Sequence, residues 1–146
     1  MNQPNCVISH LAICTANLEH SLRFYIEALG FEVKTPPIEI GPPFDTLLEM
    51  RGKRCTVSQL VCDDFKLELI SFPGSEITGC AERKAMNQRG MTHLTLFVED
   101  VDAAAARIVE YGGHMHEETR VDSQYGVILF CTDPDGVRLE LMKAVS

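Results

Sequence analysis

The sequence repeats itself once, and this repeat restricts more than any other feature how the chain can fold. Residues Ser9-His10-Leu11-Ala12-Ile13 match Thr92-His93-Leu94-Thr95-Leu96 at the spacing that separates His10 from His93. The same spacing aligns Asn17 with Asp100. Internal similarity of this kind is typical of one structural unit present twice. We therefore expect two modules of the same kind within the 146 residues.

Each copy predicts a strand, then a helix that ends at glycine. Asn17 and Asp100 stand directly before apolar residues at helical spacing, and their side chains can accept from the first amides of a helix. Gly30 and Gly112-Gly113 follow the two helices, as C-terminal caps do. The residues expected to face inward are Leu18, Leu22, Tyr25, Ile26 and Leu29 in the first helix, and Val101, Ala105, Ile108 and Val109 in the second.

Strand patterns follow each helix and predict a β-hairpin in each half. The first hairpin combines 56–62 with 65–72, and the second combines 126–132 with 137–142 around Asp133-Pro134-Asp135-Gly136. One further strand fits within 32–48, and another within 114–121. Each half is then β-α-β-β-β, which predicts an α+β fold. We expect one domain over 1–146, with modules at 6–72 and 91–143 and a linker at 73–90 that holds a short helix at 81–87.

Each half also offers one histidine in its first strand and one glutamate in its last strand. These residues are His10 and Glu68 in the first half and His93 and Glu140 in the second. A single histidine or glutamate in a strand is ordinarily structural, but these four occupy matching positions. Glu68 and Glu140 alternate with leucines and should point away from the helices. If the sheets pair by a pseudo-twofold axis, the four side chains converge and suit a divalent transition metal.

Other polar residues give weaker patterns. His20 should lie on the exposed side of the first helix, and His114 with His116 form an H-x-H pair that can chelate. Lys53-Arg54 and Arg83-Lys84 can bind phosphates, although paired basic residues are commonly solvated. The six cysteines are scattered without a C-x-x-C pair, so we expect reduced and mostly buried thiols.

The charge balance excludes several classes of partner. With 13 Lys and Arg against 21 Asp and Glu, the net charge is −8. This disfavours binding to nucleic acid and to anionic membranes, because both need clustered basic residues. The sequence holds no apolar run of about 20 residues that could span a bilayer, and its first residues lack a secretory signal. We expect a cytoplasmic protein with a small-molecule partner.

Taken together, the motifs resemble the vicinal oxygen chelate superfamily, which includes glyoxalase I, methylmalonyl-CoA epimerase, extradiol dioxygenases, and fosfomycin and bleomycin resistance proteins. The resemblance implies two βαβββ modules in an open, incomplete mixed β-barrel around a metal-binding cup, usually in a homodimer. It also implies one divalent ion (Ni, Co, Zn, Mn or Fe) held by His10, Glu68, His93 and Glu140. The matching segments are His10–Ile13, Leu22–Tyr25, Leu29–Phe31, Thr92–Leu96, Val98–Val101, Asp133–Gly136 and Leu139–Leu141.

The four-ligand set separates the branches of this superfamily. A retained Glu68 favours a lyase or isomerase of the glyoxalase I or epimerase type, in which a metal-stabilised enediolate forms and Glu140 or Glu68 abstracts the proton next to a carbonyl. The first alternative is an iron(II) extradiol-type dioxygenase, with Tyr125 or a loop histidine as acid–base helper. The second is a non-catalytic sequestering protein. The absence of Trp and an aromatic content of 7% disfavour it.

Overall fold

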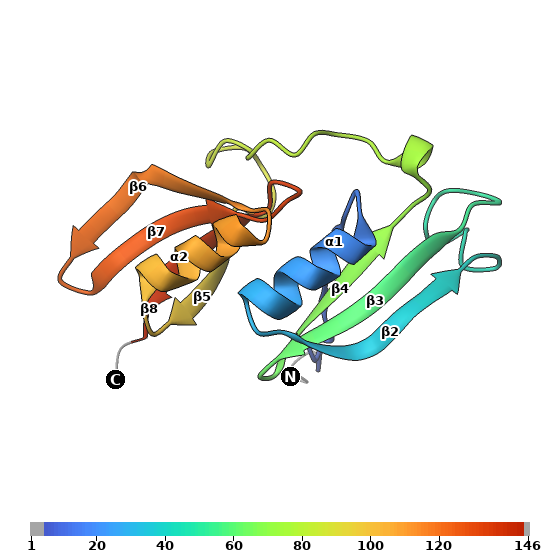
Figure 1. Cartoon of the computed structure of the whole chain (residues 1–146). Coiled ribbons are helices and arrows are strands. Elements are labelled where there is room, and N and C mark those ends of the chain that lie inside the picture. The colour runs from blue at the N-terminus through green and yellow to red at the C-terminus, as the bar shows by residue number, and fades with distance from the viewer. Residues whose placement is uncertain (1–4, 145–146) are drawn as a thin grey trace.

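The computed structural model describes residues 5–144, apart from the side chain of Ser75, and contains the same arrangement of strands and helix twice (Figure 1). The first module consists of β1 (Leu11–Cys14), α1 (Leu18–Arg23), the π-helical η1 (Phe24–Ala28), β2 (Glu32–Ile40), β3 (Cys55–Cys62) and β4 (Phe65–Ser71). After the short 3-10 helix η2 (Gly74–Glu76), the second module consists of β5 (Leu94–Val98), α2 (Val101–Glu110), β6 (His114–Ser123), β7 (Gly126–Thr132) and β8 (Arg138–Lys143).

Each module forms its own four-stranded sheet, and the two sheets have the same topology. The strand orders are β1-β4-β3-β2 and β5-β8-β7-β6. In each sheet the first strand pairs in parallel with the last, and the other pairs are antiparallel. This confirms the predicted α+β fold of two βαβββ modules. Among the described residues the strands remain in two separate sheets and do not close a barrel.

Both predicted helix caps are confirmed. The Oδ1 atom of Asn17 accepts a 3.0 Å hydrogen bond from the amide of His20, and that of Asp100 accepts a 2.9 Å bond from the amide of Ala103. Val109, however, is 49% exposed, so its predicted inward position is wrong. The buried stripe of α2 runs through Val101, Ala105 and Ile108, and Val109 lies about 100° around the helix from Ile108.

The linker does not form the helix expected at 81–87. Its main chain serves instead as a partner for the second module, because the carbonyl of Lys84 accepts a hydrogen bond from Arg138. The carbonyl of Ala81 lies so close to Gly136 that a Cβ there would approach it to 2.4 Å. A segment with few apolar residues gains more from these contacts than from an isolated helical turn.

The cysteines are less buried than predicted. Cys55 and Cys131 are buried and Cys62 is half-buried, but Cys6, Cys14 and Cys80 are exposed. Cys14 lies on the edge strand β1, where exposed residues alternate with Leu11 and Ile13, which pack against the core. Cys80 lies on the linker. All six thiols are free.

The two modules meet through their helices and through the turn that precedes β8. Apolar residues of η1, α2 and both sheets form one shared core, which includes Phe24, Ile108 and Leu129. At its edge, Asp135 accepts hydrogen bonds from the hydroxyls of Thr15 and Ser21 in the first module. None of the helices among residues 5–144 is long and apolar enough to cross a bilayer.

Candidate functional site

Glu68 and Glu140 occupy equivalent positions on the faces of the sheets that the helices leave uncovered. Their neighbours Leu67, Leu69, Leu139 and Leu141 are at most 1% exposed and face the core. Side chains alternate along a strand, so both glutamates point to the opposite face, as predicted. We call this the site face of each sheet. The two glutamates are half-buried there.

In the first module, His10 lies directly before β1 and faces Glu68 on β4. The distance from His10 Nε2 to Glu68 Oε1 is 3.8 Å. The hydroxyl of Ser9 is 3.0 Å from the other imidazole nitrogen, Nδ1. Gln59 on β3, which pairs with Glu68, donates a 3.0 Å hydrogen bond to Glu68 Oε2. Both side chains are therefore oriented by neighbours.

The second module repeats this arrangement. His93 Nε2 lies 3.4 Å from Glu140 Oε2, and the hydroxyl of Thr92 is 3.0 Å from His93 Nδ1. Thr95, the β5 partner of Glu140, donates a 2.7 Å hydrogen bond to Oε2. Phe130 packs edge-on against the His93 ring, with 5.4 Å between the ring centroids.

The donor chemistry of both pairs fits a divalent transition metal. A hydroxyl bonded to Nδ1 fixes the imidazole ring and leaves Nε2 directed at the carboxylate, which is the usual arrangement around a metal-binding histidine. An ion at about 2.0–2.2 Å from a nitrogen and an oxygen can join atoms that are 3.4–3.8 Å apart. Each pair therefore offers two of the four expected ligands.

The structure keeps the two pairs apart. Among residues 5–144 no group of three or more His, Cys, Asp or Glu side chains could hold one ion, so the four candidates do not converge within one chain. The reason is the contact between the modules, which uses α1, η1, α2 and the 133–136 turn. These elements lie on the side of each sheet opposite to the site face. The assignment of all four residues to one metal remains a prediction.

A cavity of about 310 Å³ lies between the modules. It is enclosed by β1, the linker, residues 91–94 and the start of β8, and its wall includes Lys84, Thr92, His93, Asp135 and Arg138. Of the four candidate ligands only His93 contributes to this wall. The cavity therefore adjoins the half-site of the second module.

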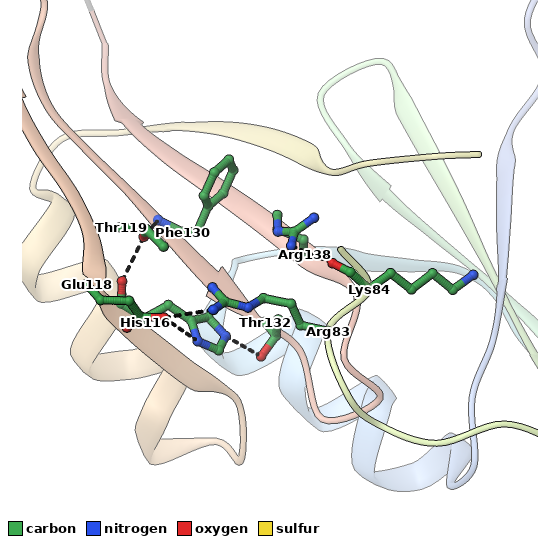
Figure 2. Close-up of polar contacts among 8 residues, drawn as sticks. All are labelled: Arg83, Lys84, His116, Glu118, Thr119, Phe130, Thr132 and Arg138. Atoms are coloured by element: carbon green, nitrogen blue, oxygen red, sulfur yellow. Dashed lines mark hydrogen bonds and ion pairs between the residues drawn. The ribbon is translucent and has the colours of Figure 1, made fainter. Parts of the chain in front are cut away.

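A second polar cluster extends the site face of that module (Figure 2). His116 on β6 pairs with Phe130, which pairs with Glu140, so these three side chains share the face. His116 Nε2 lies 3.1 Å from the hydroxyl of Thr132, and Nδ1 lies 3.7 Å from Glu118. Burial, followed by the nearby charge of Arg83, lowers the pKa of His116. The lowered pKa favours the uncharged form of this imidazole.

The remaining candidates lie elsewhere. Tyr125 is 64% exposed at the turn between β6 and β7. His20 is exposed as expected and lies 3.2 Å from the carbonyl of Tyr111. Lys53 forms an ion pair with Glu76 of η2, and Arg54 forms one with Glu39 of β2.

Sequence reasoning missed the residues that orient the four candidates. The alignment of Ser9 with Thr92 was a usable signal, because both precede the repeated histidine. Gln59 and Thr95 gave no comparable signal, since their role depends on the register between strands.

Comparison with known proteins relates the chain to a single superfamily. The family model for the Glyoxalase/Bleomycin resistance protein/Dioxygenase superfamily matches residues 7–141. The uncharacterized protein YwkD of Bacillus subtilis is 31% identical over 92% of this chain and 94% of its own. A glyoxalase family protein from Bacillus cereus has the same fold, with a TM-score of 0.84 at 14% identity over 100% of this chain and 99% of its own.

A fosfomycin resistance protein also shares the fold. The FosX protein of Listeria monocytogenes was solved with Mn(II) and a sulfate ion. It superposes with a TM-score of 0.60 at 15% identity, over 97% of this chain and 95% of its own.

Proposed function

The chain belongs to the Glyoxalase/Bleomycin resistance protein/Dioxygenase superfamily, and from this premise we propose that it is a metal-dependent lyase or isomerase that moves a proton next to a carbonyl group. The observation that carries the proposal is the pair of matching His–Glu half-sites. Each imidazole is held by a hydroxyl, and each carboxylate is held by a polar neighbour. Such supporting bonds are typical of ligands that are positioned for an ion.

We further propose that the complete centre forms between two copies of the chain. His10 and Glu68 of one copy would then join His93 and Glu140 of a second copy, which gives two equivalent centres in a homodimer. Support comes from the separation of the two pairs within one chain and from their partial exposure on the site faces. Imidazole and carboxylate donors are compatible with Ni, Co, Zn, Mn or Fe and do not select one of them.

The two glutamates carry the proton chemistry in this proposal. A divalent ion at the four donors would act as a Lewis acid toward a carbonyl oxygen of the substrate. Glu140 or Glu68 accepts the proton from the adjacent carbon and returns it to the same or a neighbouring carbon. Thr95 and Gln59 keep their hydrogen bonds to Oε2 of Glu140 and Glu68, so each carboxylate stays oriented. A positioned base of this kind typically accelerates such a step about 10²–10⁴-fold.

The extradiol-type dioxygenase remains a second candidate because of one observation. His116 lies on the site face in the same cross-strand row as Glu140, and its lowered pKa favours the neutral form that can accept a proton. Tyr125, the other helper considered, is at an exposed turn. Oxygen uptake with a catechol would favour this candidate over proton transfer.

A mixing experiment tests the shared centre. One variant carries His10→Ala and Glu68→Gln, and the other carries His93→Ala and Glu140→Gln. Neither should bind a transition metal tightly. After the two are unfolded and refolded together, each mixed dimer regains one intact centre, so metal content rises to about a quarter of the wild-type value. Each variant refolded alone is the control. The shared centre would be contradicted if the mixed variants did not regain metal that wild-type chains regain on refolding. It would also be contradicted if either variant alone retained tightly bound metal.

The reaction class has its own test. Thioesters and hemithioacetals are incubated with metal-loaded protein in deuterated water, and the α-carbon is followed by NMR. We expect deuterium to enter with wild-type protein and to be lost with Glu140→Gln. Tight binding of a small molecule without exchange or turnover would support a sequestering protein instead. A reducing compartment such as the cytoplasm fits the six free thiols.

A further inference from the structure

Arg138 is a buried basic residue on the site face of the second module. It begins β8, two residues before Glu140, and only 7% of it is exposed. Strand pairing places it beside Thr132 of β7. Its guanidinium lies over the ring of Phe130, 5.4 Å from the centroid, and the same ring also packs against His93. Arg138 therefore lies next to the half-site formed by His93 and Glu140.

Among residues 5–144, no counter-charge pairs with the guanidinium of Arg138. Its Nη2 donates a 2.6 Å hydrogen bond to the carbonyl of Lys84, which lies beside it in Figure 2. Its Nη1 donates a long 3.4 Å bond to the carbonyl of Thr92. The Nε atom is buried without a hydrogen-bond partner. No carboxylate of residues 5–144 lies within ion-pair distance of the guanidinium. A buried charge in this state is costly unless a ligand compensates it.

Two other basic residues lie near Arg138. Arg83 is close enough for its charge to act on Arg138, and Lys84 lines the same cavity. Glu118 pairs with Arg83 and offsets one of these charges. Asp135 also lines the cavity. Its carboxylate oxygens already accept hydrogen bonds from residues of the first module. Glu82 also lines this cavity, so its wall carries charges of both signs, and Arg138 is its buried cation.

We infer that the substrate carries an oxyanion group, carboxylate or phosphoryl, that binds at Arg138 in the cavity between the modules. The inference rests on the proposed function, since the rest of the substrate would reach the centre built on His93 and Glu140. The cavity volume of about 310 Å³ fits a small metabolite. Arg138 is then a specificity residue, and the field of Arg83 strengthens its attraction for the anion.

Anion binding to the full-length chain, depleted of metal with a chelator and then dialysed, tests this inference. Inorganic phosphate and acetate are titrated separately, by calorimetry and by NMR of the backbone amides. We expect saturable binding, with shifts centred on residues 92–93 and 137–139. Arg138→Gln should weaken binding at least tenfold, and Arg138→Lys should weaken it less. Tighter binding of phosphate indicates a phosphoryl group, and tighter binding of acetate indicates a carboxylate.

Arg51→Gln is the matched control, because it removes the same charge from an exposed loop of the first module. Its anion affinity should equal that of wild type. If Arg138→Gln does not fold, Arg83→Gln takes its place, with an expected loss of several-fold. Equal affinity in wild type and Arg138→Gln, shifts at other residues, or no saturable binding of either anion would overturn the inference. Metal content is measured on a separate sample that has not been treated with chelator. It reports on the proposed function alone, so the failure of one proposal is distinguishable from the failure of the other.

Discussion

The hydroxyl of Tyr25 donates a 2.9 Å hydrogen bond to Oδ2 of Asp133, 108 residues further along the chain. Both side chains are 1% exposed, and the bond joins η1 of the first module to the turn before β8 of the second. It fixes the modules through the side of each sheet that the helices cover. The two His–Glu pairs are on the other side, so this contact helps to keep them apart within one chain.

Asp133 should make stability depend on pH. Burial, together with the charge of Asp135, raises its pKa from 3.8 to about 6, although three hydrogen bonds partly oppose this. A carboxyl group with a raised folded-state pKa contributes stability that is complete below about pH 4 and lost as pH rises through 6. Asp133→Asn stays neutral. We expect wild type to lose about 2 kcal/mol of unfolding free energy relative to this variant between pH 4 and 7.

Urea unfolding at several pH values measures this difference. Asp64→Asn, in the exposed turn between β3 and β4, controls for a general change of charge. The difference between wild type and Asp64→Asn should stay nearly constant over the same range. An equally constant difference for Asp133→Asn would show that Asp133 does not ionise as expected.

Asp135 should contribute more to stability than an exposed aspartate. It accepts bonds of 2.6 Å and 3.1 Å from the hydroxyls of Thr15 and Ser21 and one of 2.9 Å from the amide of Ala16. Both hydroxyls are buried, and an unsatisfied buried group costs about 1–3 kcal/mol. Asp135→Ala should therefore lower the unfolding free energy by about 2–4 kcal/mol. A loss no larger than that of Asp64→Ala in urea unfolding would refute this assignment.

Much of the fold could be predicted because its local patterns are strong. Asn17 and Asp100 cap their helices, and each predicted hairpin is present, since these features depend on residues near one another in sequence. The linker helix and Val109 were predicted wrongly, because tertiary contacts decide both. Lys84 has its carbonyl bound by Arg138, which no local pattern indicates.

The candidate site could be predicted as residues but not as an arrangement. Repetition and alternation with leucines identified His10, Glu68, His93 and Glu140. Their division into two pairs depends on how the modules pack, and that packing follows from Tyr25, Asp133 and other contacts over a hundred residues apart. The burial of Arg138 could not be predicted either, because it depends on the linker, whose Lys84 carbonyl accepts a hydrogen bond from the guanidinium.

Gly113 should not tolerate a side chain. A Cβ atom there would lie 2.4 Å from the carbonyl oxygen of Thr132, 2.6 Å from Ile108 and 2.9 Å from Phe24, all in the core between the modules. Because a backbone atom is among these neighbours, the contact cannot be relieved by one rotamer change. We expect Gly113→Ala to cost about 2–3 kcal/mol in thermal or urea unfolding. Gly74→Ala is the control, since no atom lies within 4 Å of a Cβ built at Gly74. The unfolding free energy of this variant should differ from that of wild type by less than about 1 kcal/mol.

Thr92 and Ser9 should control metal affinity without contacting the ion. Each hydroxyl lies 3.0 Å from Nδ1 of the following histidine and fixes the ring so that Nε2 faces the glutamate. Losing such a supporting bond typically weakens metal binding about 10–100-fold. Thr92→Val and Ser9→Ala should each show a loss of this size in competition with a chromophoric chelator, whereas Thr92→Ser, which keeps the hydroxyl, should bind like wild type. If Thr92→Val also binds like wild type, then the hydroxyl does not orient a metal ligand, and His93 would have to be held by the Phe130 contact instead.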